Sequence, residues 1–112
     1  MAVADYPDPP MMEDKLSYTI KLDGRDLYIN DSEQPVKLTP MEARLLAVLL
    51  QNPNQVVSRA TLMREVWGTD YMEDTRTLDV HISWLRRKVE EDPTRPWRLV
   101  TARGLGYCLR MK

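Results

Sequence analysis

The sequence of 112 residues contains only one cysteine, Cys108, which excludes an internal disulfide bond. It has neither a CxxC pair nor a cluster of cysteine and histidine, the patterns that bind structural zinc. Such sparse cysteine usage is typical of the reducing cytoplasm, and we expect Cys108 to be a small buried hydrophobe rather than a reactive thiol. We therefore predict a cytoplasmic protein without a metal site.

Long hydrophobic runs are absent as well. The longest, Leu45–Leu50, has six residues, whereas a helix that spans a bilayer needs about 20. The N-terminus carries acids and prolines where a signal peptide would carry a basic and then an apolar stretch. The sequence thus predicts neither membrane insertion nor export.

Catalytic constellations are missing too. The sequence has no glycine-rich loop for a nucleotide and no set of serine, histidine and acid, or of cysteine and histidine, for nucleophilic catalysis. The one histidine, His81, is more typical of a structural or phosphate-contacting residue than of a base or ligand. The acid pairs Glu73-Asp74 and Glu90-Glu91 are expected to be solvated surface. We predict no enzymatic activity and no cofactor.

Basic charge is scarce in the first half of the chain and concentrated in the last third. Residues 1–58 hold five Lys/Arg and nine Asp/Glu, a net charge of −4, and residues 59–75 carry −2. Residues 76–112 hold nine Lys/Arg and four Asp/Glu, a net charge of +5, although the whole chain has −1. A chain with this distribution can still present a basic face to phosphates, because the local field decides their binding.

The first third of the sequence predicts a tail and a small sheet. Residues 1–15 contain three prolines and four acids without an apolar period, which is typical of a disordered tail or inter-domain linker. From residue 16 to 38, short alternating patterns predict three antiparallel strands, with turns at Asp23-Gly24 and Asn30–Pro35. We therefore expect one folded domain over residues 16–111.

Capping signals predict two helices after the strands. In Thr39-Pro40-Met41-Glu42, the threonine and the glutamate form a capping box around a proline at the first helical position, and Asn52-Pro53 ends that helix. Ser58 is the N-cap of a second helix, which Gly68 ends. The loop that follows, Thr69–Asp74, is acidic.

A third helix is predicted from about Thr75 to Glu91, where Asp92-Pro93 ends it. A β-hairpin follows, with extended segments over residues 97–101 and 107–110. Short helices joined by a loop and followed by a hairpin are the parts of a winged helix. We therefore predict an α+β fold, a winged helix-turn-helix with an N-terminal antiparallel sheet, three helices and a C-terminal β-hairpin wing.

The third helix has two different faces. At 100° per residue, one apolar stripe predicts the core face; it consists of Leu78, Ile82, Leu85 and Val89. The opposite face carries Arg76, Val80, Ser83, Trp84 and Arg87, with Thr77 and Arg86 at its flanks. One explanation is a solvated basic face, with Trp84 packed against another protein element. The other is recognition in the DNA major groove, where arginine binds guanine edges, apolar groups contact thymine methyls and flanking residues bind phosphates.

The hairpin supplies a second candidate contact. Arg103 precedes Gly104-Leu105-Gly106 and is expected at the tip of a tight turn, from which an arginine can enter the narrow minor groove. An ordinary exposed loop arginine explains the position equally well. Tyr107 and Trp67 are expected to be packing residues.

Four motifs, taken in order, resemble the effector domains of OmpR/PhoB-type response regulators. They are Leu38-Thr39-Pro40-Met41-Glu42, Val66-Trp67-Gly68, residues 76–82 with 85–88, and residues 101–107. The resemblance covers about residues 16–111, and motifs in this order and spacing are very specific. It implies a four-stranded N-terminal sheet, three helices and a wing; the strand patterns described above account for three of those strands.

The resemblance also implies a function, which is sequence-specific binding of double-stranded DNA that controls transcription in a two-component system. Members of the family bind direct repeats in tandem, often head to tail. The third helix, about residues 76–91, would enter the major groove, and the wing, about residues 97–110, the minor groove. The candidate DNA-binding residues are Arg76, Thr77, Val80, His81, Ser83, Trp84, Arg86, Arg87, Thr101 and Arg103.

The acidic loop is a candidate contact for a protein partner. Members of the family contact RNA polymerase or its sigma subunit through the loop between the second and third helices. In this sequence the loop consists of Thr69, Asp70, Tyr71, Met72, Glu73 and Asp74. Its acids suit a basic partner surface, although a merely solvated loop is just as compatible.

The sequence departs from the family pattern at Ser83 and Trp84, where some relatives carry arginines that contact phosphate and bases. A guanine contact from position 84 is therefore not available. We expect Trp84 to make apolar or stacking contacts at the groove edge, or to pack within a tandem interface. A protein-interaction winged helix, with Trp84 and Val80 as a docking patch, is the alternative function.

A second departure concerns the upstream receiver domain with its phosphorylated aspartate, for which 112 residues leave no room. We expect an excised C-terminal domain, with the first residues left from a linker, rather than a naturally short regulator.

Overall fold

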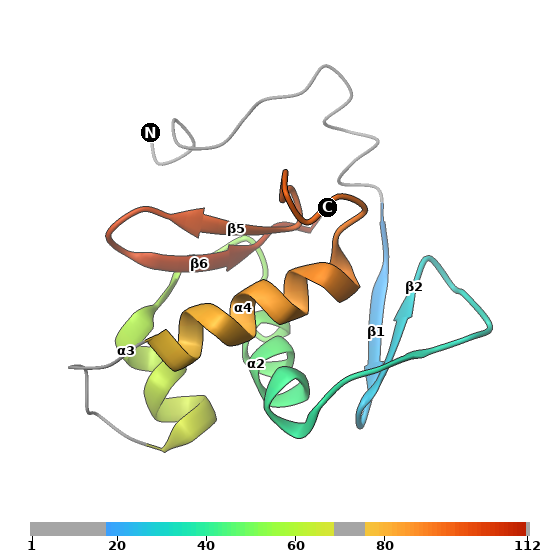
Figure 1. The fold of residues 1–112 in the computed structure, drawn as a ribbon, viewed down its shortest axis with the longest axis horizontal. Helices are drawn as coiled ribbons and strands as arrows, with labels where there is room; N and C mark the ends of the chain where they lie inside the picture. Colours follow the sequence, from blue (N-terminus) through green and yellow to red (C-terminus); the bar gives the residue numbers. More distant parts are fainter. Residues whose placement is uncertain (1–17, 69–75, 112) are drawn as a thin grey trace.

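The computed structural model describes residues 18–68 and 76–111, which form two antiparallel sheets with helices between them (Figure 1). The predicted tail over residues 1–15 and the predicted loop Thr69–Asp74 lie outside the described residues. The described elements confirm the α+β class and the order of sheet, helices and terminal hairpin. Within these two ranges, no helix has the length and apolar character needed to cross a membrane.

The N-terminal sheet consists of β1 (Ile20–Asp23), β2 (Asp26–Ile29) and β3 (Val36–Lys37), in that order, and all neighbours are antiparallel. The predicted turn at Asp23-Gly24 is confirmed, because Gly24 adopts a left-handed φ of 61° between β1 and β2. Leu27 points into the core and is fully buried. The three predicted strands are present in residues 18–68; the fourth strand of the family's sheet is not among the described residues.

Helix α2 (Pro40–Leu50) begins at the predicted capping box. The Thr39 side chain accepts a hydrogen bond from the backbone N–H of Glu42, and the Glu42 carboxylate accepts one from the backbone N–H of Thr39 at 2.7 Å. These reciprocal bonds satisfy two amides that the start of a helix leaves without partners. Leu45 and Leu49 on its inner face are fully buried.

The second predicted helix consists of two parts, α3 (Arg59–Leu62) and the π-helical turn η2 (Met63–Trp67). The side chain of Ser58 accepts a hydrogen bond from the backbone of Thr61 at 3.1 Å, which confirms the predicted cap. Gly68 ends the segment with a left-handed φ of 70°. The π-helical turn was not predicted, since apolar spacing over so short a segment does not separate the two kinds of helix.

The C-terminal sheet has the order β4-β6-β5, with β4 (Val57–Ser58), β5 (Leu99–Ala102) and β6 (Gly106–Leu109). Strands β5 and β6 form the predicted hairpin, which we call the wing. Strand β4 was not predicted because two residues carry no readable alternation. Its pairing depends on Gly106, where a Cβ would lie 2.0 Å from the carbonyl oxygen of Val57.

Helix α4 (Arg76–Val89) runs beside the wing and crosses α2 (Figure 1). Its predicted core stripe is confirmed, because all four residues have exposed fractions of at most 1%; they are Leu78, Ile82, Leu85 and Val89. The side chains of α2, α3 and β5 complete a single apolar core around this stripe. Burial of the whole inner face leaves the outer face of α4 to solvent.

The prediction that Glu90 is solvated surface is wrong. Its side chain is buried and accepts hydrogen bonds from the backbone N–H groups of Trp97, Arg98 and Leu99, at 2.7 to 2.9 Å. A carboxylate that follows α4 therefore fixes the start of β5. The Cys108 prediction is confirmed, since the residue is buried and burial raises the pKa of its thiol.

Candidate nucleic-acid interface

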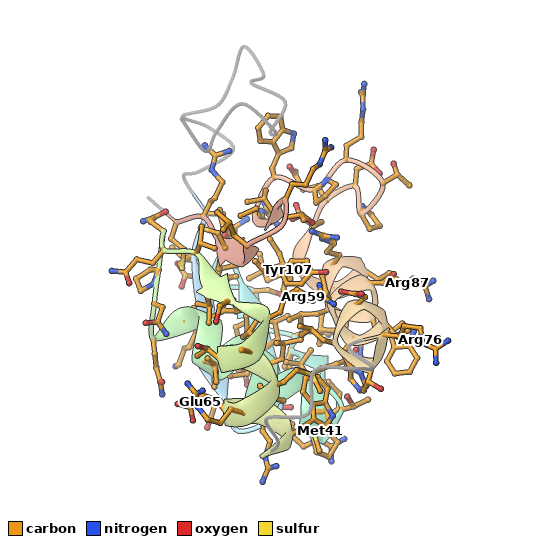
Figure 2. All side chains as sticks on the ribbon, turned by 90° about the vertical axis from the view of Figure 1, so that its left-hand side faces the viewer. Met41, Arg59, Glu65, Arg76, Arg87 and Tyr107 are labelled. Atoms are coloured by element: carbon orange, nitrogen blue, oxygen red, sulfur yellow. The ribbon has the colours of Figure 1, made fainter. Side chains whose placement is uncertain are left out.

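Among residues 18–68 and 76–111, nothing covers the outer face of α4, and neither sheet packs on it. Most of the predicted contact residues on this helix are exposed; they are Arg76, Thr77, Val80, Ser83, Trp84 and Arg87. Figure 2 shows the side chains of Arg76 and Arg87 projecting away from the body of the protein. Arg76 and Arg87 thus lie with the apolar residues Val80 and Trp84 on one accessible surface, which we call the α4 outer face.

Val80 and Trp84 lie one turn apart on the α4 outer face, with exposed fractions of 42% and 41%. The ring of Trp84 lies 4.9 Å from the ring of His81, which lies 5.1 Å from the ring of Trp67 in an edge-on arrangement. His81 is half-buried, and its Nδ1–H donates to the carbonyl of Thr77 at 2.8 Å. The histidine therefore supports Trp84 from within the protein.

Arg86 is placed differently from the other predicted arginines. Its guanidinium donates to the carbonyl of Leu99 and to the hydroxyl of Thr101, both at 2.9 Å, and it lies over the ring of Tyr107. The residue is half-buried, and burial lowers the pKa of its guanidinium. The structure therefore joins Arg86 and Thr101 to each other across α4 and β5, and does not bring Arg86 together with Arg87 on the α4 outer face.

Asp79 connects α4 to two other elements. Its carboxylate accepts two hydrogen bonds from Arg59 of α3, at 2.7 and 3.0 Å, and one from the hydroxyl of Tyr107 in β6 at 2.6 Å. The bond from Arg59 lowers the pKa of the Asp79 carboxyl by more than burial raises it, and Tyr107 lowers it further. Burial and the Asp79 carboxylate raise the pKa of Tyr107.

Asp79, Arg59 and Tyr107, which we call the Asp79 cluster, connect α4 to α3 and to the wing. Figure 2 shows Arg59 and Tyr107 side by side between the helices. Sequence reasoning identified Tyr107 as an anchor but missed Arg59, which lies 20 positions from its partner. No local spacing rule links residues so far apart in the sequence.

The turn of the wing carries Arg103. The residue is exposed, and the amide of Leu105 donates to the carbonyl of Ala102 across the turn at 2.9 Å. Gly104 adopts a left-handed φ of 75°, which the tight turn requires. Figure 1 shows this turn and the first turn of α4 at the same end of the molecule. Arg76 at the start of α4 and Arg103 in the wing therefore lie at one end of the molecule, whereas Arg87 lies in the last turn of α4.

Part of the basic charge of residues 76–112 is used inside the fold. Lys88 contacts the buried carboxylate of Glu42, and Arg98 is buried, donates to the carbonyl of Val89 at 2.7 Å and lies over the ring of Tyr18. These two cations stabilise the packing of α4. The exposed positive charge at the candidate interface is correspondingly smaller than the segment's net charge indicates.

Within residues 18–68 and 76–111, no group of three or more His, Cys, Asp or Glu side chains is placed to hold a metal ion. The α4 outer face offers forked donors, hydroxyls and apolar side chains instead. Those groups suit the edges of bases and the oxygens of phosphates.

The chain is similar to known transcriptional regulators. A family model described as "Transcriptional regulatory protein, C terminal" matches residues 33–109. The sensory transduction protein RegX3 of Mycolicibacterium smegmatis is 44% identical over 90 residues, which are 80% of this chain and 40% of that protein. The chain thus spans less than half the length of this relative.

Two solved structures have the same fold and contain DNA. The RstA DNA-binding domain of Klebsiella pneumoniae, in complex with the RstA box, is 26% identical with a TM-score of 0.67, covering 81% of this chain and 96% of that one. The DNA-binding domain of the response regulator AdeR, in complex with an intercistronic region, is 30% identical with a TM-score of 0.65, covering 83% and 95%.

Proposed function

The chain belongs to the family of C-terminal DNA-binding domains of transcriptional regulatory proteins, and from this premise we propose how it engages DNA. Helix α4 enters the major groove of double-stranded DNA with its outer face, and the wing reaches the adjacent minor groove. The observation that carries the proposal is the α4 outer face, on which arginines surround exposed apolar residues on a helix whose opposite side is the core. An α-helix with its side chains fits the width of the major groove.

The proposed contacts of α4 with DNA differ in their chemistry. Arg76 and Arg87 bind phosphates or guanine edges, and the hydroxyls of Thr77 and Ser83 bind phosphate oxygens. His81 lies behind the apolar residues and supports Trp84. These contacts set both the affinity and the orientation of the helix in the groove.

The wing contributes in two ways. Arg103 inserts into the minor groove, where a narrow A·T-rich segment has the strongest negative potential. Arg86 and Thr101 act through their mutual hydrogen bond, which holds β5 against α4 and so sets the distance from the recognition helix to the wing. Arg86 is thus a positioning residue in this proposal.

The larger assembly follows from the family. We propose tandem, head-to-tail binding on direct repeats, contact of the loop Thr69–Asp74 with RNA polymerase, and an upstream receiver domain in the complete regulator. The relative RegX3 is named a sensory transduction protein and is longer than this chain, which supports a regulated protein of more than one domain. Such a regulator works in the cytoplasm, with the DNA.

The salt dependence of DNA binding tests the proposal. With about five phosphates neutralised, the plot of log affinity against log salt concentration should have a slope of roughly −4 to −5. Arg87→Ala should make that slope shallower by about one, because one phosphate contact is lost. Lys21→Ala, at an exposed residue of β1, is the matched control and should leave the slope unchanged.

Arg103→Ala extends the same measurement to the wing. Binding should weaken mainly at sites flanked by A·T-rich minor grooves and little at G·C-rich sites. An equal loss of affinity at both kinds of site would mean that Arg103 contacts only phosphate. A slope near zero for the unmodified chain would contradict the proposed function as a whole.

A further inference from the structure

The apolar residues on the α4 outer face are unusual for a surface that faces a polyanion. The described residues include few exposed large hydrophobics; they are Val36, Val56, Val80, Trp84 and Leu105. Two of these, Val80 and Trp84, lie one helical turn apart on α4. We propose that Trp84, together with Val80, makes this domain select thymine methyl groups in its DNA site; the proposal rests on the proposed function.

A chain of aromatic side chains supports Trp84 from the protein side. His81 contacts its ring at 4.9 Å and is itself held by the Thr77 carbonyl and by the ring of Trp67. Trp67 is half-buried and anchored in η2, so the support reaches into the packed part of the protein. An indole held in this way makes contact without losing much rotamer freedom, and contacts of that kind bind more tightly.

The chemistry of the side chains decides which base is selected. Neither an indole nor an isopropyl group can accept or donate the paired hydrogen bonds that identify guanine or adenine. The methyl group on C5 of thymine is the one apolar group that unmodified DNA presents in the major groove.

The surrounding charges identify DNA rather than protein as the occupant of this apolar ridge. Arg76 and Arg87 lie on the same face and project outward with it (Figure 2). A hydrophobic protein partner would have to bury or neutralise both arginines, whereas the phosphates that border a major groove pair with them. The ridge between the arginines then faces the base edges.

The test replaces thymine by uracil, which removes one methyl group and leaves base pairing intact. A binding site is first selected from random duplexes with the 112-residue chain, and each thymine is then replaced in turn by deoxyuridine. We expect one or two positions per half-site at which the dissociation constant rises roughly fourfold, the effect of burying one methyl group. Replacement at the remaining thymines should have no effect.

Variants assign the effect to Trp84. In Trp84→Ala, thymine and uracil at the sensitive position should bind equally, whereas Trp84→Leu, which keeps an apolar group, should retain part of the preference. Val36→Ala, which shortens a valine with an exposed fraction of 40% on β3, is the matched control and should keep the full preference. Circular dichroism shows whether each variant remains folded.

The outcomes separate this inference from the proposed function. If the selected site tolerates uracil at every position while binding remains specific, the methyl contact is absent and only this inference fails. If Trp84→Ala keeps the thymine preference, or lowers only the cooperativity between two bound copies, Trp84 does not contact the methyl group. If no sequence is selected at all, the proposed function itself fails.

Discussion

Glu42 and Glu90 illustrate how single carboxylates hold α4 in place. Glu42, with an exposed fraction of 1%, caps α2 and accepts a hydrogen bond from Lys88 of α4. Glu90 accepts three backbone N–H groups at the start of β5. Because buried charges are costly unless donors surround them, each carboxylate fixes the elements that supply its donors.

Removal of the Glu42 charge should change stability in a pH-dependent way. Burial raises the pKa of Glu42, but hydrogen bonds from Lys88 and Thr39 outweigh it, so the pKa lies below its ordinary value of 4.5. The contribution of Glu42 to stability is therefore complete above pH 4.5 and is lost as the pH falls through the lower pKa of the folded state. In Glu42→Gln, the free energy of unfolding at pH 7 should fall by about 2 kcal/mol, because Lys88 loses a charged acceptor.

Urea unfolding at a series of pH values measures this effect. The free energy of unfolding of Glu42→Gln should decline less steeply below pH 4.5 than that of the unmodified protein. Glu65→Gln, at an exposed position, is the control and should follow the unmodified protein. Parallel curves for Glu42→Gln and the unmodified protein would show that the carboxylate contributes nothing as an ion.

At the residue scale, the sequence predicts the contacts that neighbouring residues of the chain make. The capping box of Thr39 and Glu42 and the C-terminal glycine of the second helix are read from neighbours along the chain, and the structure confirms them. The pairing of Arg59 with Asp79 depends on the packing of α3 against α4. Such partners become visible only once tertiary contacts are known.

The wing is an element whose position depends on a few contacts. Arg86 joins α4 to β5, the Asp79 cluster joins α4 to β6, and Gly106 lets β4 approach β6. Each contact comes from a different part of the chain. Together they explain why so short a hairpin keeps a defined position beside the helix.

Gly106→Ala should detach β4 from β6. The added Cβ would lie 2.0 Å from the Val57 carbonyl oxygen and 2.9 Å from the Cα of Ser58, so the backbone must move. We expect the free energy of unfolding to fall by about 3 kcal/mol, as for severe overpacking. Thermal or urea unfolding measures the change.

Gly104→Ala is the matched control for this variant. A Cβ at Gly104 meets no atom within 4 Å, and its cost comes only from the left-handed φ of 75°. That cost should be about 1 kcal/mol. If the free energy of unfolding falls equally in the two variants, the clash with β4 adds no cost of its own. In that case β4 does not restrain the wing.

At the element scale, periodicity predicts the faces of the helices and misses the shortest or least regular elements. The core stripe of α4 follows from a spacing that recurs along a helix of 14 residues, and all four members of the stripe are buried. The two-residue strand β4 and the π-helical turn η2 have no comparable repeat. Their existence depends on the partner strand and on the packing of Met63 and Val66.

At the scale of the whole molecule, the two sides of α4 have different roles. Its inner side joins α2 and the wing into one core, and its outer side presents arginines with an apolar ridge. The sequence predicts this division correctly but overestimates the positive charge available to DNA, because Lys88 and Arg98 turn inward. Net charge along a chain cannot distinguish exposed cations from those that stabilise packing.

The most direct test of the α4 outer face is an NMR titration of the isotope-labelled chain with the selected duplex. The amide signals of Val80 and Arg87, the indole signal of Trp84 and the amide of Arg103 should shift together, while those of β1 and β2 stay unchanged. Shifts confined to the N-terminal sheet, with α4 unaffected at saturating DNA, would contradict the assignment of α4 as the helix that binds DNA.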